Sequence, residues 1–206
     1  MEVILHFFFY LYPKKMACEV HVVGTILSAA FLGQGSASFC RYDIVSGPGW
    51  TVLEGSLNGQ TQTAISSYEA DLGGIDGSTV LWEHPIEVQF SCATITGWPM
   101  IVLTIWRQDE YGRNEICGYG SARIPPCPGL HNIEVACWRP KGTFYQELHA
   151  WFLQGGLPHL TDQTMIVLPE TGQRHKIYTS TEAVVSLEIN VLCKGFTERG
   201  IVFIDE

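Results

Sequence analysis

The segment that most constrains this chain is residues 82–113, where two apolar runs and two X-Pro steps follow one another closely. Residues 86–90 alternate apolar and polar side chains, a period of two that predicts a strand with one buried face. Residues 101–106 are apolar at every position except Thr104, which predicts a strand covered on both faces. Pro99 stands just before this run, where a missing backbone N–H is tolerated. We therefore expect the two runs to pair as the central hairpin of a β-sandwich.

The same alternation recurs along the rest of the chain. Within the strand expected at residues 184–192, residues 185–191 alternate apolar and polar side chains, as one-sided burial requires. Further strands are expected at residues 19–26, 39–45, 50–53, 119–124, 133–137, 164–168 and 175–178. Gly and Pro cluster between several of these runs, so turns are expected to connect them. Short strands at regular spacing predict an all-β fold, an antiparallel β-sandwich.

One amphipathic helix is expected at residues 143–154. Thr143 and Gln146 have the spacing of a capping box, in which each side chain satisfies a free backbone N–H. A single apolar stripe follows, formed by Phe144, Leu148, Trp151 and Phe152. Gly155 ends the pattern, as glycine commonly does after a helix. We expect this helix to cover an open end or edge of the sandwich.

Residues 1–15 are expected to lie outside the folded domain. The apolar run at residues 3–12 is too short to span a bilayer, which takes about 20 apolar residues. A secretory signal carries its positive charge before the apolar run, whereas Lys14 and Lys15 follow it here. Met16 is a natural start for the domain. We interpret residues 1–15 as an upstream extension of the kind that start-site choice can produce.

The remaining sequence is expected to form one domain. A chain of 206 residues, 46% hydrophobic and 16% charged, is long enough to bury a core without covalent staples. We place the domain at residues 17–195, with its motifs densest at residues 17–143, and a C-terminal tail at residues 196–206.

Charge and cysteine usage exclude several classes of function. The net charge of −9 disfavours nucleic-acid binding, which depends on Lys and Arg neutralising phosphates. The seven cysteines are odd in number and include no C-x-x-C pair, so neither a zinc finger nor a disulfide framework is indicated. We expect reduced, mostly buried cysteines in a cytosolic protein.

Catalytic motifs are missing from the sequence. It holds no G-x-S-x-G elbow and no H-E-x-x-H pair. The G-x-G steps at residues 33–35 and 118–120 lack the helix that a phosphate loop requires, so turns or small-residue packing explain them better. His84 has no second His or Cys at ligand spacing, which favours a structural hydrogen bond over catalysis or metal binding. No enzyme, cofactor or small-molecule substrate is expected.

Calcium is the one metal that needs separate consideration, because many β-sandwiches bind it through loop aspartates. Calcium takes six to eight oxygen ligands, mostly from clustered carboxylates. Asp109 and Glu110 lie together beside Gly112, and the other aspartates are scattered singly, with no D-x-D pair. We therefore expect no bound metal.

Two kinds of residue suggest contacts with a partner protein. Trp138 and Arg139 end a predicted strand, and Trp151 lies on the predicted helix. Trp and Arg are over-represented among the residues that anchor protein interfaces. The alternative is that Trp138 belongs to the core and Arg139 is a solvated cap, and the sequence leaves both interpretations open.

Nine short motifs, taken in order, resemble those of the B9 domain family. They are E-V-H-V-V-G at residues 19–24, F-C at 39–40, G-Q-T-Q at 59–62, W-E-H-P-I-E at 82–87, G-W-P at 97–99, W-R-Q-D-x-x-G-R at 106–113, G-Y-G at 118–120, P-x-x-P-G at 125–129 and C-W-R-P-x-G at 137–142. The resemblance covers residues 17–195. We expect the motif residues to be structural: Trp82, His84, Pro85, Gly97, Trp98, Pro99, Trp106, Asp109, Gly112 and Arg113.

The resemblance implies a β-sandwich like the calcium- and lipid-binding modules, without the calcium aspartates. It implies a non-enzymatic scaffold subunit of a tectonic-like (Meckel syndrome) complex at the ciliary transition zone, in the cytoplasm and cytoskeleton at the basal body. Its partners would be related B9 domain proteins, bound through sheet edges and residues 138–151, with peripheral membrane contact as a further expectation. Its role would be to support ciliogenesis and the ciliary membrane diffusion barrier. The alternative is a peripheral phospholipid-binding module that acts on its own.

Overall fold

The structure is a computed structural model that describes residues 18–31, 37–65, 78–108, 112–142, 178–201 and 203. Its elements are β1 (Cys18–Phe31), β2 (Ser38–Val45), β3 (Trp50–Gly55), β4 (Asn58–Gln60), β5 (Ser78–Cys92), β6 (Met100–Gln108), β7 (Asn114–Arg123), β8 (Gly129–Pro140), β9 (Thr179–Lys194) and the short 3-10 helix η2 (Thr197–Arg199). Every strand predicted within these ranges is confirmed. The predicted helix at residues 143–154 and the predicted strand at 164–168 lie outside the described residues. So do residues 1–15 and nearly all of the strand predicted at 175–178.

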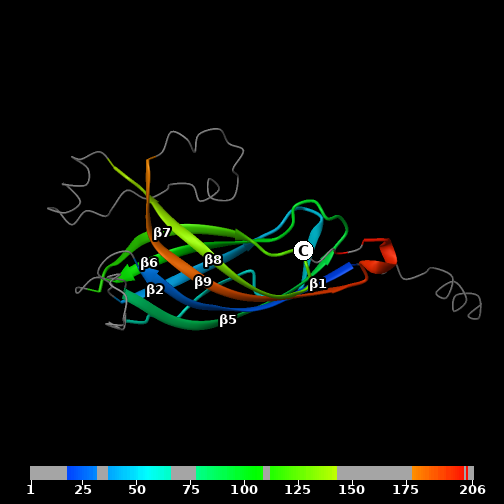
Figure 1. The fold of residues 1–206 in the computed structure, drawn as a ribbon, viewed down its shortest axis with the longest axis horizontal. Coiled ribbons are helices and arrows are strands. Elements are labelled where there is room, and N and C mark those ends of the chain that lie inside the picture. Colours follow the sequence, from blue (N-terminus) through cyan, green and yellow to red (C-terminus); the bar gives the residue numbers. More distant parts are fainter. Residues whose placement is uncertain are drawn as a thin grey trace, which may run out of the picture.

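The nine strands of the described residues join in one antiparallel sheet, in the order β3-β5-β1-β9-β8-β7-β6-β2-β4, and they run close to the long axis of the molecule (Figure 1). We call β3, β5, β1, β9 and β8 the β1 layer, and β7, β6, β2 and β4 the β6 layer. In the described part of the chain, the layers share one paired position, Tyr119 of β7 with Trp138 of β8. The predicted antiparallel all-β fold is thus confirmed, and its two layers are halves of one curled sheet.

The sheet also turns back at its other margin. The edge strands β3 and β4 follow each other in the chain, joined by residues 56–57. The backbone N–H of Ile44 donates to the carbonyl of Leu57 at 2.6 Å, which holds this link against β2. Because β3 pairs with β5 and β4 pairs with β2, the short link carries the chain from one layer to the other.

The main core lies between the two layers. From β9 it receives Val185, Leu187, Ile189 and Val191, the apolar half of the predicted alternation. From β6 it receives Ile101, Leu103 and Ile105, while Val102 and Thr104 on the opposite face are buried as well. The prediction that β6 is covered on both faces is therefore confirmed. Alternation fixes which face of a strand is buried because successive side chains point to opposite sides of the sheet.

The predicted hairpin of β5 with β6 is wrong. β5 lies between β1 and β3, and β6 lies between β2 and β7, so the two strands are not neighbours. The residues between them carry the chain from the β1 layer to the β6 layer. Gly97 makes this crossing possible, since its φ is +74° and a Cβ there would lie 2.5 Å from the Cα of Gly47. The pattern indicated two strands correctly but could not show their partners.

The last described turn closes one end of the molecule. Figure 1 shows η2 in red at the end where β1 begins. Phe196, just before η2, is buried, and Ile201 and Phe203 pack against the core. The thiol of Cys18 donates to the carbonyl of Gly195 at 3.4 Å. These contacts join the start of β1 to the segment that follows β9.

Candidate functional site

Trp82 ties the two layers together. Its side chain is 1% exposed, and its indole Nε1 donates to the carbonyl of Ser38 at 3.1 Å. Its own carbonyl accepts from Nε2 of Gln62 at 2.6 Å. The register of β5 with β1 shifts here, and Glu83 has a φ of +47°. This bulge turns the strand so that Trp82 can reach the β6 layer.

The next two motif residues have structural surroundings. The ring of His84 lies 5.8 Å from the ring of Tyr42, across the core from β5 to β2. Pro85 is paired with Thr25 of β1, on a part of β5 beyond its last pair with β3. A strand proline is tolerated where its nitrogen has no ladder partner to serve. Within the described ranges, no group of three His, Cys, Asp or Glu side chains is placed to hold a metal ion.

The G-W-P motif organises the end of the sheet where β5 passes to β6. Trp98 packs edge-on against Trp50, with ring centroids 4.9 Å apart. Trp50 in turn donates from Nε1 to the carbonyl of Thr96 at 3.1 Å. The carbonyl of Pro99 accepts from the backbone N–H of Ile124 at 3.2 Å. These contacts hold the crossing in the position that Gly97 permits.

The W-R-Q-D-x-x-G-R motif begins on the outer face of the β6 layer. Trp106 stacks parallel to Phe39, with centroids 6.1 Å apart, and the guanidinium of Arg41 lies 5.0 Å from the centroid of Trp106. Gly112 is exposed and has a φ of +77°, and Arg113 is exposed beside it. Asp109 lies outside the described residues. A stacked arginine over aromatic rings supplies a cation–π contact at a partly solvated site.

The predicted partner contacts are only partly brought together. Trp138 is half-buried, with its ring 6.1 Å from that of Tyr119. Arg139 donates from Nε to Oε1 of Glu182 at 2.8 Å, and the hydroxyl of Ser180 donates to the same oxygen at 2.7 Å. Trp151 lies outside the described residues. Arg139 thus takes part in an ion pair between β8 and β9, and a contact with a partner stays a prediction.

Most of the cysteines lie in the core. All seven are among the described residues, five of them are buried, and none forms a disulfide. Burial raises the pKa of the Cys137 thiol to about 12 and that of the Cys92 thiol to about 11. A nucleophilic cysteine needs a lowered pKa, because the thiolate is the reactive form. These thiols serve the core as small apolar groups, as the sequence predicts.

The sequence interpretation missed three exposed apolar residues on the outer face of the β1 layer. Val23 is 38% exposed, Leu130 is 62% exposed and Leu192 is 52% exposed. They come from β1, β8 and β9. Val23 and Leu130 are both paired with Asn190, and Leu192 is paired with His21 next to Val23 on the same face. We call Val23, Leu130 and Leu192 the apolar patch.

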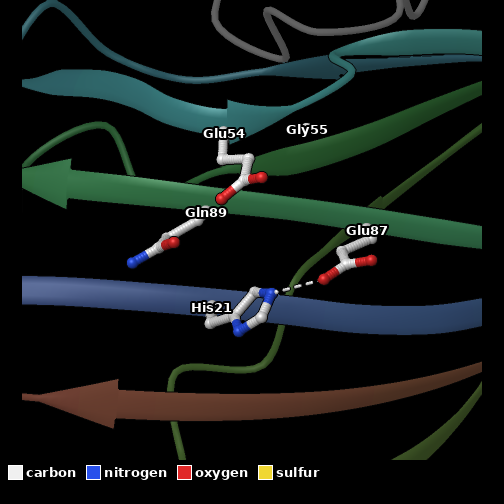
Figure 2. Close-up of a pocket in the computed structure, with 5 residues that line it drawn as sticks. All are labelled: His21, Glu54, Gly55, Glu87 and Gln89. Atoms are coloured by element: carbon white, nitrogen blue, oxygen red, sulfur yellow. Dashed lines mark hydrogen bonds and ion pairs between the residues drawn. The ribbon is translucent and has the colours of Figure 1, made fainter.

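A shallow pocket adjoins the apolar patch. Figure 2 shows its lining residues, His21 from β1, Glu87 and Gln89 from β5, and Glu54 and Gly55 from β3. The Nε2 of His21 lies 3.1 Å from Oε1 of Glu87. Glu87 is paired with Val23, and His21 with Leu192, so the pocket and the patch share an edge. The site therefore combines exposed apolar side chains with two surface carboxylates.

A signal for the patch was present in the sequence. In a strand with one buried face, every second residue should be polar. Val22 and Val23 are consecutive apolar residues in β1, so one of them must face outward. Leu130 and Leu192 likewise occupy outward positions of β8 and β9. These are positions at which a regular alternation would place polar side chains.

A family model described as "Ciliary basal body-associated, B9 protein" matches residues 20–192. The chain belongs to the B9 domain family. Its match spans β1 to β9 almost completely, so the domain includes both layers, the apolar patch and the pocket.

Named relatives agree with this assignment. B9 domain-containing protein 2 of Rattus norvegicus is 33% identical over 89% of this chain and 98% of its own length. The Homo sapiens protein of the same name is 32% identical over the same shares. B9 domain-containing protein 1 of Mus musculus is 28% identical over 87% of this chain and 83% of its own.

Among the solved structures that match is one of low structural similarity. A domain of plant Extended Synaptotagmin 1 superposes with a TM-score of 0.38 at 10% sequence identity, over 86% of this chain and 96% of that one. No helix within the described ranges has the length and hydropathy needed to cross a membrane.

Proposed function

We propose that this B9 domain is a non-enzymatic scaffold subunit that binds related B9 domain proteins. The complex would be of the tectonic-like (Meckel syndrome) kind at the ciliary transition zone and basal body, in the cytoplasm and cytoskeleton. There it would support ciliogenesis and the ciliary membrane diffusion barrier. The observation that carries the proposal is the match of residues 20–192 to a ciliary basal body-associated family.

The surroundings of the chemically capable residues support a binding role. His84 contacts an aromatic ring, Arg139 is held by Glu182, and burial keeps the Cys92 and Cys137 thiols protonated. A catalytic site brings a nucleophile, a base and a stabilising donor together within hydrogen-bond distance. The described residues instead place these groups apart, each in contact with the core or with a neighbouring strand.

A reconstitution of the complex tests this function. The full chain is coexpressed with a B9 domain-containing protein 1 from the same organism, and the mixture is analysed by size-exclusion chromatography with light scattering. We expect one species whose mass equals one copy of each chain or a small multiple of that sum. Separate elution of the two chains at micromolar concentration would contradict the proposal.

A second candidate is a peripheral phospholipid-binding module that acts on its own. The observation in its favour is Ile95, which is 53% exposed in the connection between β5 and β6. An apolar side chain at a loop tip can enter the headgroup region of a bilayer. The net charge of −9 opposes attraction to anionic lipid, so we rank this function second. Flotation of the isolated chain with liposomes, abolished by Ile95→Asp, would establish it.

A further inference from the structure

We infer that the outer face of the β1 layer is the docking surface for the partner protein, and that the partner presents apolar side chains rimmed by Lys or Arg. The inference rests on the proposed function and adds to it the place of contact and the chemistry of the partner. The surface consists of the apolar patch, Val23, Leu130 and Leu192, together with the carboxylates beside it, Glu54, Glu87 and Glu188.

Three of the exposed apolar side chains lie around one residue, Asn190. Single exposed hydrophobic residues are normal on any protein and need no explanation. Here Val23 and Leu130 are both paired with Asn190, and Leu192 follows two residues later on the same strand. Apolar side chains grouped on one face and rimmed by polar groups are typical of a site of interaction. Docking of an apolar surface on the patch would remove these three side chains from water.

The rim of the patch carries more acidic than basic side chains, and Lys194, two residues beyond Leu192 on β9, is already paired with Glu19 at 3.1 Å. Glu87 lies beside Val23, and Glu188 lies in the next outward row, paired with Thr25. Glu54 faces the pocket from β3 (Figure 2). Glu87 contacts His21, whereas Glu54 and Glu188 join no ion pair with another described residue. Complementary charge selects a partner and speeds its encounter, so these carboxylates favour a partner with basic side chains.

The same charges disfavour other occupants. An anionic membrane surface would be repelled by Glu54, Glu87 and Glu188, since the phospholipid attraction depends on Lys and Arg. Nucleic acid is disfavoured for the same reason. A second copy of this chain would place like carboxylates opposite one another if the face met itself around a two-fold axis. A different protein with a basic rim satisfies both the apolar and the charged parts of the surface.

Binding of surface variants to the B9 domain-containing protein 1 partner tests the inference. Val23→Asp should weaken the equilibrium affinity about tenfold or more, because it places a charge in the centre of the interface. Val45→Asp is the matched control, since Val45 is also 38% exposed but lies on the outer face of the β6 layer. It should change the affinity less than about twofold, as expected of a residue outside the interface. Circular dichroism and thermal unfolding of both variants show whether each is folded.

A charge-reversal pair tests the rim. Glu54→Lys with Glu87→Lys should slow association about tenfold and weaken its dependence on salt concentration. The control is Asp43→Lys with Glu198→Lys, which changes the net charge equally at exposed positions of β2 and η2. It should leave the association rate within about twofold, because the effect of rim charge is local.

The outcomes separate the two proposals. If the wild-type chain does not bind the partner, the proposed function fails and this surface assignment fails with it. If the wild type binds and folded Val23→Asp and the Glu54/Glu87 pair bind equally well, only the surface assignment is overturned. Self-association of the isolated chain that is lost with Val23→Asp, while partner binding persists, would assign the face to a second copy and also overturn the inference. Weaker partner binding in Val23→Asp and in the Glu54/Glu87 pair, but not in their controls, supports the inference.

Discussion

The two outer faces of the curled sheet differ in how far their apolar residues are buried. On the β6 layer, the outward side chains of Phe39, Val102 and Tyr119 are buried. Part of their cover lies within the described residues, since Trp106 stacks on Phe39 and the ring of Trp138 contacts Tyr119.

On the β1 layer, outward Val23, Leu130 and Leu192 remain exposed. Both faces thus carry apolar residues at outward positions. On the β6 layer Phe39, Val102 and Tyr119 are packed within the chain, although Val45 at the end of β2 is 38% exposed. An apolar residue at an outward position can therefore be covered by other residues of the same chain, as on the β6 layer, or stay exposed as an interaction surface, as we infer for the β1 layer. The exposed fraction of the side chain distinguishes the two cases. Substitution of a covered residue should lower stability, and substitution of an exposed one should weaken binding.

The largest difference in stability loss is expected between substitutions at Tyr119 and at Leu192. Tyr119 is 1% exposed, and within the described residues its pairing with Trp138 is the one that joins the two layers. Tyr119→Ala should therefore lower the free energy of unfolding by about 3–5 kcal/mol. Leu192→Ala should change it by about 0.5 kcal/mol or less, because the side chain is already in water. Urea denaturation of both variants measures the two values. Equal losses would mean that the two faces do not differ in packing.

The contact between β7 and β8, where the two layers meet, leaves no room for a side chain at Gly120. A Cβ on Gly120 would lie 2.6 Å from Sγ of Cys137 and 2.9 Å from Cγ1 of Val135, so Gly120→Ala should destabilise the protein by about 1–3 kcal/mol. Adding Cys137→Ala removes the nearer atom and should recover part of the loss. A double-mutant cycle by urea denaturation measures this coupling. Strict additivity of the two changes would show that the crowding is relieved elsewhere.

A smaller effect separates the two glutamines of the G-Q-T-Q motif. Gln62 donates to the carbonyl of Trp82 in the opposite layer at 2.6 Å, so Gln62→Ala should cost about 1 kcal/mol of stability. Gln60 accepts from Arg41 on its own layer at an exposed position, so Gln60→Ala should cost about 0.5 kcal/mol or less. Thermal unfolding of the two variants checks the order. A larger loss for Gln60 would contradict the role of Gln62 as a link between layers.

The buried thiols of Cys92 and Cys137 should react slowly with alkylating reagents in the native state. Burial raises the pKa of Cys92 to about 11 and that of Cys137 to about 12, from an ordinary value of 9.0. Because the folded state favours the neutral thiol, this contribution to stability is complete below about pH 9 and is lost as pH rises toward these values. At pH 8, iodoacetamide should modify both thiols at least about tenfold faster in urea than in buffer. Peptide mass spectrometry reads each site, and equal rates would contradict their burial.

Much of the fold follows from the alternation of apolar residues, but the strand partners do not. Residues 86–90 and 101–106 are strands with the predicted faces buried, because facing depends only on the local period of two. Their pairing was predicted wrongly, because it depends on which distant strands they meet. The bulge at Trp82 and the crossing at Gly97 arise from such tertiary contacts. The segment at residues 82–113 contains none of the strands that they actually pair with, which are β1 and β3 for β5, and β2 and β7 for β6.

The candidate site shows a similar division. Trp138 and Arg139 were predicted to contact a partner because Trp and Arg anchor interfaces. In the structure, Arg139 forms an ion pair with Glu182 of the same chain. The apolar patch was hidden because Val23, Leu130 and Leu192 lie far apart in sequence and meet only through the β1, β8 and β9 register. The consecutive apolar pairs Val22–Val23 and Val191–Leu192 were local signs that this layer has an apolar outer surface.

The most direct test of the account places a photo-reactive phenylalanine analogue at single sites of the full chain within the reconstituted complex. One variant carries it at Leu192 on the outer face of the β1 layer, and its control carries it at Val45 on the outer face of the β6 layer. After irradiation, we expect a cross-link to the B9 domain partner from position 192 and none from position 45. A cross-link from position 45 with none from position 192 would contradict the assignment of the β1 layer as the binding surface.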